Sequence, residues 1–198
     1  VSYWCEQRRR RFPDTHVIEH YVGIGAGATD HYATMLHIME EIKIRFARDE
    51  PLPTAPQEIE RQFPAWLERT RGERVIVVID GINQLFGAAL HLGWLPRNIP
   101  SVVRLVVTTT VEQTLVDLRT RGWERLGMQM LRENEREAVV VRFLSEYHKA
   151  LSSEQVARVA LDPKCAHALF LRTLLEELRL VGRHEDLDVT LDEFLNTT

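Results

Sequence analysis

The feature that most constrains the fold is a short apolar segment that ends in an acid. Residues 74–85 read RVIVVIDGINQL, so an unbroken apolar run from Val75 to Ile79 is followed at once by Asp80 and Gly81. A short apolar run bounded by a turn is typical of a strand that is buried on both faces. Such a strand lies inside a parallel sheet with helices on both sides, and the rest of the chain must supply those partners.

The chain up to residue 131 alternates strands and helices. Strands are predicted over 16–22, 74–79 and 102–107, with a short one near 125–130. Helices are predicted over 1–11, 32–46, 57–70 and 111–121, with Thr29 or Asp30 as N-cap of the second and a disturbance near Pro64 in the third. This alternation predicts an α/β fold with a parallel sheet and crossover helices, which are expected to cover the apolar strands on both faces.

After residue 132 the apolar periodicity is helical throughout. One predicted face comprises Val139, Val140, Phe143, Leu144, Tyr147 and Leu151. A second comprises Leu171, Leu174, Leu175, Leu178 and Val181, and ends at Gly182. A last helix is predicted over 187–195. We therefore predict two domains, an α/β domain at 1–131 and a helical subdomain at 132–198.

Composition limits the setting and the partners. The net charge of −4 argues against a surface built mainly for nucleic acid. Cys5 and Cys165 match no metal-binding spacing, and they fit a reducing, cytoplasmic setting. No apolar stretch is long enough to span a bilayer, so no membrane partner is expected.

Asp80 stands at a position that favours binding of a ligand or a metal ion. Ligands bind at the carboxyl ends of the strands in open parallel sheets, and Asp80 ends a predicted strand. A carboxylate there can hold the Mg²⁺ that bridges nucleotide phosphates, which is the Walker B pattern. The alternative is that Asp80 caps a turn in which Gly81 takes a positive φ.

Four segments in order carry a resemblance to a known family. They are HYVGIGAGATD (20–30), RVIVVIDGINQL (74–85), LGWLPRNIPSVVRLVVTTT (92–110) and LFLRTLLEELRLVGRHEDL (169–187). Together they resemble NACHT-type P-loop NTPases of the STAND class, particularly the nephrocystin-like and telomerase-associated-protein-like group. The second segment looks like Walker B, the third like the sensor 1 strand, and the fourth like the helical subdomain behind the nucleotide.

The resemblance implies a nucleotide switch that binds Mg²⁺ with ATP or GTP. The 198 residues contain no G-x-x-x-x-G-K-[ST] loop, so we expect the first strand and the P-loop to lie upstream. Without them, 1–131 is a partial nucleotide-binding domain, which we expect to be unstable or inactive alone. The resemblance also implies protein partners that bind flanking TPR-type or WD-type repeats, and a homo-oligomer.

The loop GIGAGATD (23–30) could substitute for the P-loop, because it is rich in glycine and opens a helix. Its spacing is not that of Walker A, however, and it has no lysine. The alternative is a tight strand-to-helix turn that needs glycine conformations.

Asn83 and Gln84 stand where many ATPases of this class place an acid that polarises the attacking water. An amide can orient water but cannot take its proton. Gln84 is therefore interpreted as a water-positioning or sensing group, with slow hydrolysis or binding without turnover. Alternatively, both amides simply bond the loop backbone.

Thr108, Thr109 and Thr110 follow the strand at 102–107, at a position that resembles sensor 1. A hydroxyl of Thr108 or Thr109 could bond a γ-phosphate or the attacking water. No arginine stands close by to stabilise charge more strongly, which weakens the case for fast catalysis. The alternative is a threonine-rich strand end and helix start.

Other candidates are weaker. His16 and His20 would lie about 13 Å apart in a strand, too far to share a metal, and His31 and His37 do not have the i,i+4 spacing. No G-x-S-x-G nucleophile elbow is present. Arginines 8–11 could contact RNA, but such a run more often closes a helix. A non-hydrolysing scaffold domain and a nucleic-acid module therefore remain as alternatives to the switch.

Overall fold

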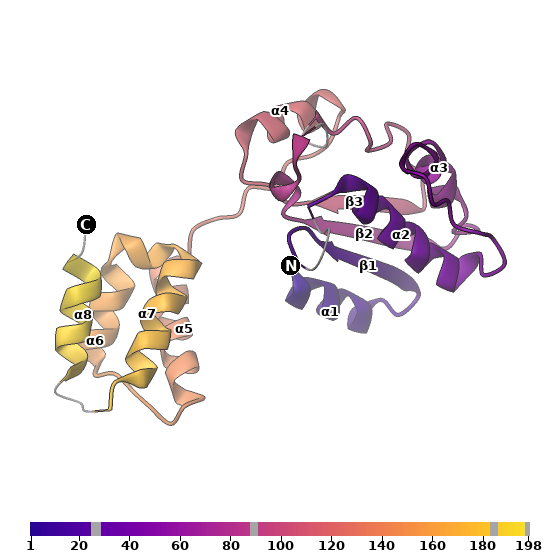
Figure 1. Cartoon of the computed structure of the whole chain (residues 1–198). Coiled ribbons are helices and arrows are strands. Elements are labelled where there is room, and N and C mark those ends of the chain that lie inside the picture. Colours follow the sequence, from indigo (N-terminus) through magenta and orange to yellow (C-terminus); the bar gives the residue numbers. More distant parts are fainter. Residues whose placement is uncertain (25–28, 88–90, 183–185, 197–198) are drawn as a thin grey trace. The chain divides into compact units, whose positions relative to one another are not determined.

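A computed structural model describes residues 1–198 except 25–28, 88–90, 183–185 and 197–198. The chain divides into two compact units, Val1–Arg125 and Leu126–Thr198 (Figure 1). The division falls a few residues before the predicted boundary after residue 131. Each unit is described by itself.

Among its described residues, the first unit is built on a parallel sheet of three strands. They are β1 (Thr15–Tyr21), β2 (Arg74–Asp80) and β3 (Val103–Val107). The order is β1-β2-β3, and both neighbouring pairs are parallel. This confirms the predicted α/β class and places the RVIVVID segment in the middle of the three strands.

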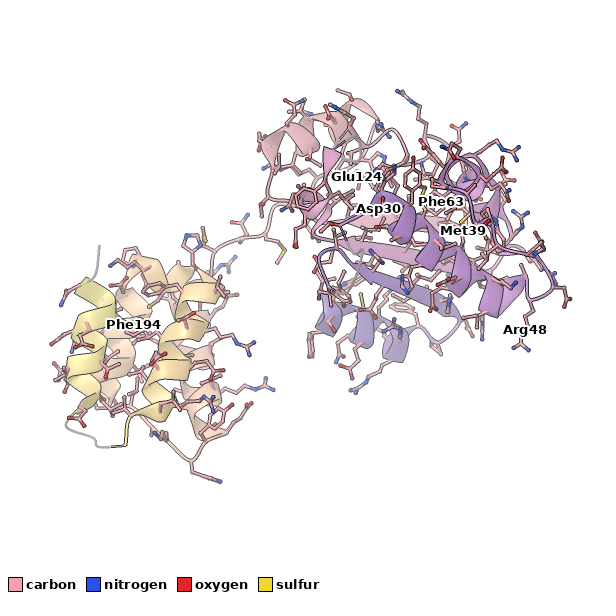
Figure 2. The ribbon with its side chains drawn as sticks, in the orientation of Figure 1. Asp30, Met39, Arg48, Phe63, Glu124 and Phe194 are labelled. Carbon is pink, nitrogen blue, oxygen red and sulfur yellow. The ribbon has the colours of Figure 1, made fainter. Side chains whose placement is uncertain are left out.

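Helices cover the two faces of this sheet unequally. The described helices are α1 (Ser2–Arg11), α2 (His31–Phe46), α3 (Pro56–Glu68) and α4 (Glu112–Thr120), and the 3-10 turn η1 (Ile82–Gln84) follows β2. The larger core joins one face of the sheet to α2 and α3, which contribute the fully buried Met39 and Phe63 (Figure 2). The other face carries α1, whose Cys5 is buried with Val17 and two residues of β2 (Figure 1).

The strand β2 is covered on both faces, as the sequence predicted. Its residues from Val75 to Ile79 are all buried. In β3, by contrast, Arg104 and Val106 are exposed, Val106 by 38%. The prediction of full cover was wrong for β3, because α1 packs against β1 and no helix among the described residues lies over these two side chains.

Local sequence explains where the helices of this unit begin. Asp30 is the N-cap of α2 and accepts a hydrogen bond from Tyr32 N at 3.0 Å, as one of the two predicted caps. Pro56 stands in the first turn of α3, where its missing N–H removes no bond. Pro64 lies inside α3, and the helix continues through it.

The second unit is all helical, as predicted. Its elements are α5 (Glu133–Ser145), α6 (Ser153–Leu161), the 3-10 turn η3 (Pro163–Ala166), α7 (Ala168–Leu180) and α8 (Asp186–Asn196). Its core contains Val140, Leu144, Val159, Cys165, Leu171, Leu174, Leu175, Leu178 and Leu191. The sequence prediction missed α6, although Ser152 and Gln155 form a capping box that marks its start.

Two predictions about this part of the chain were wrong. Residues 125–130 form no strand; they are an irregular segment in which Leu126 and Met128 are largely exposed. Val139 and Tyr147 are exposed rather than in the core, because Val139 lies outside the buried stripe of α5 and Tyr147 follows the end of that helix. No helix in the described ranges is both long and apolar enough to cross a membrane.

Helix ends in the second unit are closed by charged side chains. Lys149 Nζ donates to Val181 O at 2.6 Å and to Arg179 O, at the carboxyl end of α7. Arg136, which is buried, donates from Nη1 to Asp162 O at 2.7 Å, at the end of α6. These donors satisfy carbonyls that a helix leaves unpaired at its end, and they oppose its negative partial charge.

Candidate functional site

The carboxyl ends of the three strands meet at one edge of the sheet. Tyr21 pairs in register with Asp80, and Ile79 pairs with Val107. The loops that follow are tied together by backbone bonds, from Val22 N to Asp80 O at 2.9 Å and from Ile82 N to Thr108 O at 3.0 Å. Residues that lie far apart in the sequence are thereby held at one edge, where open parallel sheets bind ligands.

Asp80 and Thr108 are in direct contact at this edge. Thr108 Oγ1 donates to Asp80 Oδ1 at 2.5 Å and accepts a hydrogen bond from Gly81 N at 2.8 Å. Both side chains are half-buried. The threonine hydroxyl therefore fixes the orientation of the carboxylate, and Asp80 Oδ2 forms no hydrogen bond with any residue in the described ranges.

The turn after β2 depends on glycine. Gly81 has φ 75°, in the left-handed region, and η1 follows it at once. The positive φ expected for Gly81 is thus confirmed. The Asp80 carboxylate, however, accepts a hydrogen bond from the Thr108 hydroxyl rather than from the backbone of the turn.

The side chain of Gln84 packs against two glycines, Gly23 and Gly81. A Cβ placed on Gly23 would lie 2.2 Å from Gln84 Oε1, and one on Gly81 would lie 2.7 Å from Gln84 Nε2. The carboxamide therefore touches the loop after β1 as well as the loop after β2. Substitution at either glycine would displace it, and both glycines also have positive φ.

The amides of Asn83 and Gln84 are available for further partners. Within the described part of the chain neither side chain forms a hydrogen bond. The alternative interpretation, in which both amides bond the loop backbone, therefore has no supporting contact among these residues. Gln84 is exposed and Asn83 is half-buried. A carboxamide in this state can donate to and accept from one water molecule.

Thr109 serves the start of the next helix. Its Oγ1 accepts a hydrogen bond from Val111 N at 3.1 Å, just before α4. Thr109 therefore has the contact expected of a residue at a helix start, whereas the hydroxyl of Thr108 faces the Asp80 carboxylate. Thr110 is exposed.

Part of the glycine-rich loop lies outside the described residues. Gly25 and Gly27 belong to 25–28, so their interpretation as a phosphate cradle has no geometry to support it. Gly23 has φ 88°, which agrees with a turn that needs glycine.

Sequence reasoning missed a cluster of two histidines. His20 Nδ1 lies 3.1 Å from His37 Nδ1, and His20 Nε2 lies 3.1 Å from Thr34 Oγ1. His20 is on β1 and His37 on α2, so spacing rules within one element could not pair them. Burial lowers the pKa of His20 to about 4, with a further contribution from His37.

The remaining candidates have structural partners. Arg9 pairs with Glu19 and donates to Val17 O at 2.9 Å, and the Arg8 guanidinium lies 3.9 Å from the Phe12 ring centre. Burial raises the pKa of Cys5 to about 11, so its thiol is protonated at neutral pH and is a poor nucleophile.

Sequence comparison finds distant relatives that are much longer. No family model matches the chain. The chain is 25% identical over 230 residues to a TPR repeat-containing protein of Dictyostelium discoideum, covering 95% of this chain and 14% of that protein. It is 24% identical over 204 residues to nephrocystin-3 of Mus musculus, covering 98% of this chain and 15% of that protein. The chain thus spans about a seventh of the length of these curated relatives.

Comparison with solved structures finds mutants of RuvB from Thermotoga maritima. One matches with a TM-score of 0.46 at 18% identity, covering all of this chain and 68% of that one. Another matches with a TM-score of 0.43.

Proposed function

We propose that this chain supplies the Walker B and sensor 1 edge of a nucleotide-binding switch domain of the NACHT/STAND type. Asp80 is the ligand that holds Mg²⁺, directly or through water, and Thr108 is the polar sensor beside it. The nucleotide is ATP or GTP, and its phosphates are held by a P-loop that we place upstream of residue 1. The domain belongs to a cytoplasmic signalling or scaffold protein.

The contact between Asp80 and Thr108 carries this proposal. A hydroxyl that donates to one carboxylate oxygen leaves the other oxygen for a hard cation. Both residues stand at the strand ends where parallel sheets bind ligands. If Asp80 only capped a surface turn, the positive φ of Gly81 would be enough. A hydroxyl from Thr108, at the end of the neighbouring strand, would not be needed to orient the carboxylate.

The donor set at this edge fits Mg²⁺ with phosphates. Mg²⁺ prefers oxygen ligands, keeps several waters, and is commonly held by one or two carboxylates together with phosphate oxygens. When bound, the ion would be held by the Asp80 carboxylate and would neutralise the charge of the phosphates. The chain's own part is to hold the Asp80 carboxylate in place by means of Thr108.

Turnover in this proposal is slow. Gln84 and Asn83 orient the attacking water, but neither amide can accept its proton. Gln84 also touches Gly23, so it can report a change in the loop after β1 to the loop after β2. Slow turnover suits a switch, since the bound nucleotide then holds one conformation for a long time.

A second candidate is a scaffold domain that has lost hydrolysis. This candidate is favoured by Asn83 and Gln84, two amides at the positions where many ATPases of this class have an acid. In either case we infer protein partners that bind repeats outside this segment, because one distant relative is named for its TPR repeats. Self-association belongs to the same proposal.

The test is Mg²⁺-dependent binding of ATP and GTP to a chain extended upstream through the expected P-loop. We expect Asp80→Ala to abolish binding, and Asp49→Ala, at an exposed turn, to leave it unchanged. Gln84→Ala should keep binding and slow phosphate release. Binding without phosphate release would favour the non-hydrolysing scaffold. No Mg²⁺-dependent binding would refute the switch, and the fold would then be kept for assembly, with Asp80 only a turn residue.

A further inference from the structure

The histidine pair between β1 and α2 has the geometry of two ligands of one metal ion. Tetrahedral bonds of 2.0–2.1 Å from a metal to nitrogen place the two nitrogens about 3.3 Å apart, and a right-angled pair places them about 2.9 Å apart. The Nδ1 atoms of His20 and His37 are 3.1 Å apart, between these values. The rings are tilted by 45°, with their centres 5.2 Å apart.

The outer nitrogen of each ring faces an acceptor. His20 Nε2 lies 3.1 Å from Thr34 Oγ1, which itself donates to Asp30 O at 3.2 Å. His37 Nε2 lies 3.9 Å from Glu41 Oε1. Histidines that bind metals usually donate their other N–H to a carboxylate, a carbonyl or a similar acceptor, which fixes the tautomer.

Protons can be assigned consistently in both states. Without metal, the Thr34 hydroxyl donates to Asp30 O, so His20 donates from Nε2, and its bare Nδ1 accepts from Nδ1–H of His37. With metal, both Nδ1 atoms are bare ligands, and His37 carries its proton on Nε2, toward Glu41. The rings stay neutral, so binding moves the His37 proton from one nitrogen to the other and releases none.

We propose that His20 and His37 form a site for a divalent transition-metal ion of the Zn²⁺, Ni²⁺ and Cu²⁺ class, bound through both Nδ1 atoms. Imidazole suits these ions, whereas Mg²⁺ takes oxygen ligands. In the described ranges no group of three or more His, Cys, Asp and Glu side chains could hold a metal. The protein therefore gives two ligands, and water completes the shell.

The position of the site gives it access and preorganisation. The His37 side chain is 38% exposed, so an ion can enter from solvent on that side. His20 is held on β1, and Thr34, which is fully buried, fixes its outer nitrogen. A bound ion would join β1 to α2, independently of the proposed nucleotide site.

The test is calorimetric titration of the 198-residue chain with ZnCl₂ near pH 7.5. We expect one equivalent to bind, and His37→Gln and His20→Gln each to abolish that binding. His167→Gln, which removes an exposed histidine of the second unit, should leave it intact. Thr34→Val should weaken it about tenfold or more, because the outer partner of His20 is lost. Tryptophan fluorescence would verify that each variant is folded.

Nitrogen chemical shifts of the histidine rings give an independent readout. On addition of Zn²⁺ we expect the His37 proton to move from Nδ1 to Nε2, while His20 keeps Nε2–H. Equal Zn²⁺ binding by the wild type and His37→Gln would overturn the proposal. Unchanged ring shifts would also overturn it, and the pair would then be only hydrogen-bonded.

Discussion

The two units use their polar side chains in different ways. In the second unit, the ammonium of Lys149 and the guanidinium of Arg136 point at backbone carbonyls and close helix ends. In the first unit, Asp80, Asn83 and Gln84 collect at one edge of the sheet, with hydrogen-bonding capacity left over. Groups that act on a ligand need hydrogen-bonding capacity that the fold itself does not use. We therefore propose ligand chemistry for this edge of the α/β unit, and a structural role for Lys149 and Arg136 in the helical unit.

The largest expected effect tests whether the two cores are separate. Phe63→Ala opens a cavity in the first core and should lower the unfolding free energy of that unit by about 3–5 kcal/mol. All four tryptophans, at positions 4, 66, 94 and 123, lie in the first unit, so their fluorescence follows that unit alone. Urea unfolding with this probe measures the loss.

Leu174→Ala is the matched variant, because Leu174 is fully buried in the second core. It should cost the helical unit about 2–5 kcal/mol. We expect far-UV circular dichroism to detect this loss while the tryptophan transition stays in place. If each variant shifted both transitions equally, the units would unfold as one, and the comparison would fail.

A smaller effect is expected at the closed end of α7. Lys149→Met removes the donor to Val181 O and Arg179 O and should destabilise the second unit by about 1.5–3 kcal/mol, as for hydrogen bonds of a charged group. Circular dichroism melting measures the change. Arg142→Met, at a highly exposed position of α5, is the control and should change little. A similar loss in the control would show that net charge, not the contact, matters.

Thr108→Val should affect the first unit, by about 1 kcal/mol, because the bonds to Asp80 and Gly81 are lost. Tryptophan fluorescence during urea unfolding is the measurement. Thr108→Ser keeps the hydroxyl and should be nearly neutral. If Ser and Val were equally destabilising, packing of the methyl group would be responsible, and the hydrogen bonds would not hold the carboxylate.

The last expected effect is a dependence of stability on pH in the first unit. Burial lowers the pKa of His20 from its ordinary 6.5 to about 4. Between these values the unfolded chain binds a proton that the folded chain does not. The stability of this unit should therefore be complete above pH 6.5 and decline as the pH falls toward 4. The slope of unfolding free energy against pH, measured by tryptophan fluorescence, should flatten in His20→Gln. An equal slope in both proteins would assign the effect to other groups.

The sequence predicted much of the first unit because periodicity and caps are local. The RVIVVID strand and the Asp30 cap follow from residues close together in the chain, and the parallel arrangement follows from the alternation of strands and helices along it. The exposure of Val106 could not be predicted in this way. The apolar residues around Val106 are typical of a buried strand, but whether a helix covers its side chain depends on where α1 packs on the sheet.

The same limit applies to the candidate site. The sequence predicted Asp80 and Thr108 separately, but their contact depends on the register of β2 and β3. The pairing of His20 with His37 depends on which turn of α2 lies against β1. Contacts between elements need the packed geometry, and no spacing within one element encodes them.

The irregular segment from residue 123 to 132 also affects how the protein is handled. Leu126 is 88% exposed and Met128 is 91% exposed, in a stretch without a helix or a strand. Proteases that prefer leucine or methionine need an extended, accessible backbone of this kind. A brief digestion should therefore cut here first and yield two fragments, each with its own core. This segment is thus the natural place to dissect the protein.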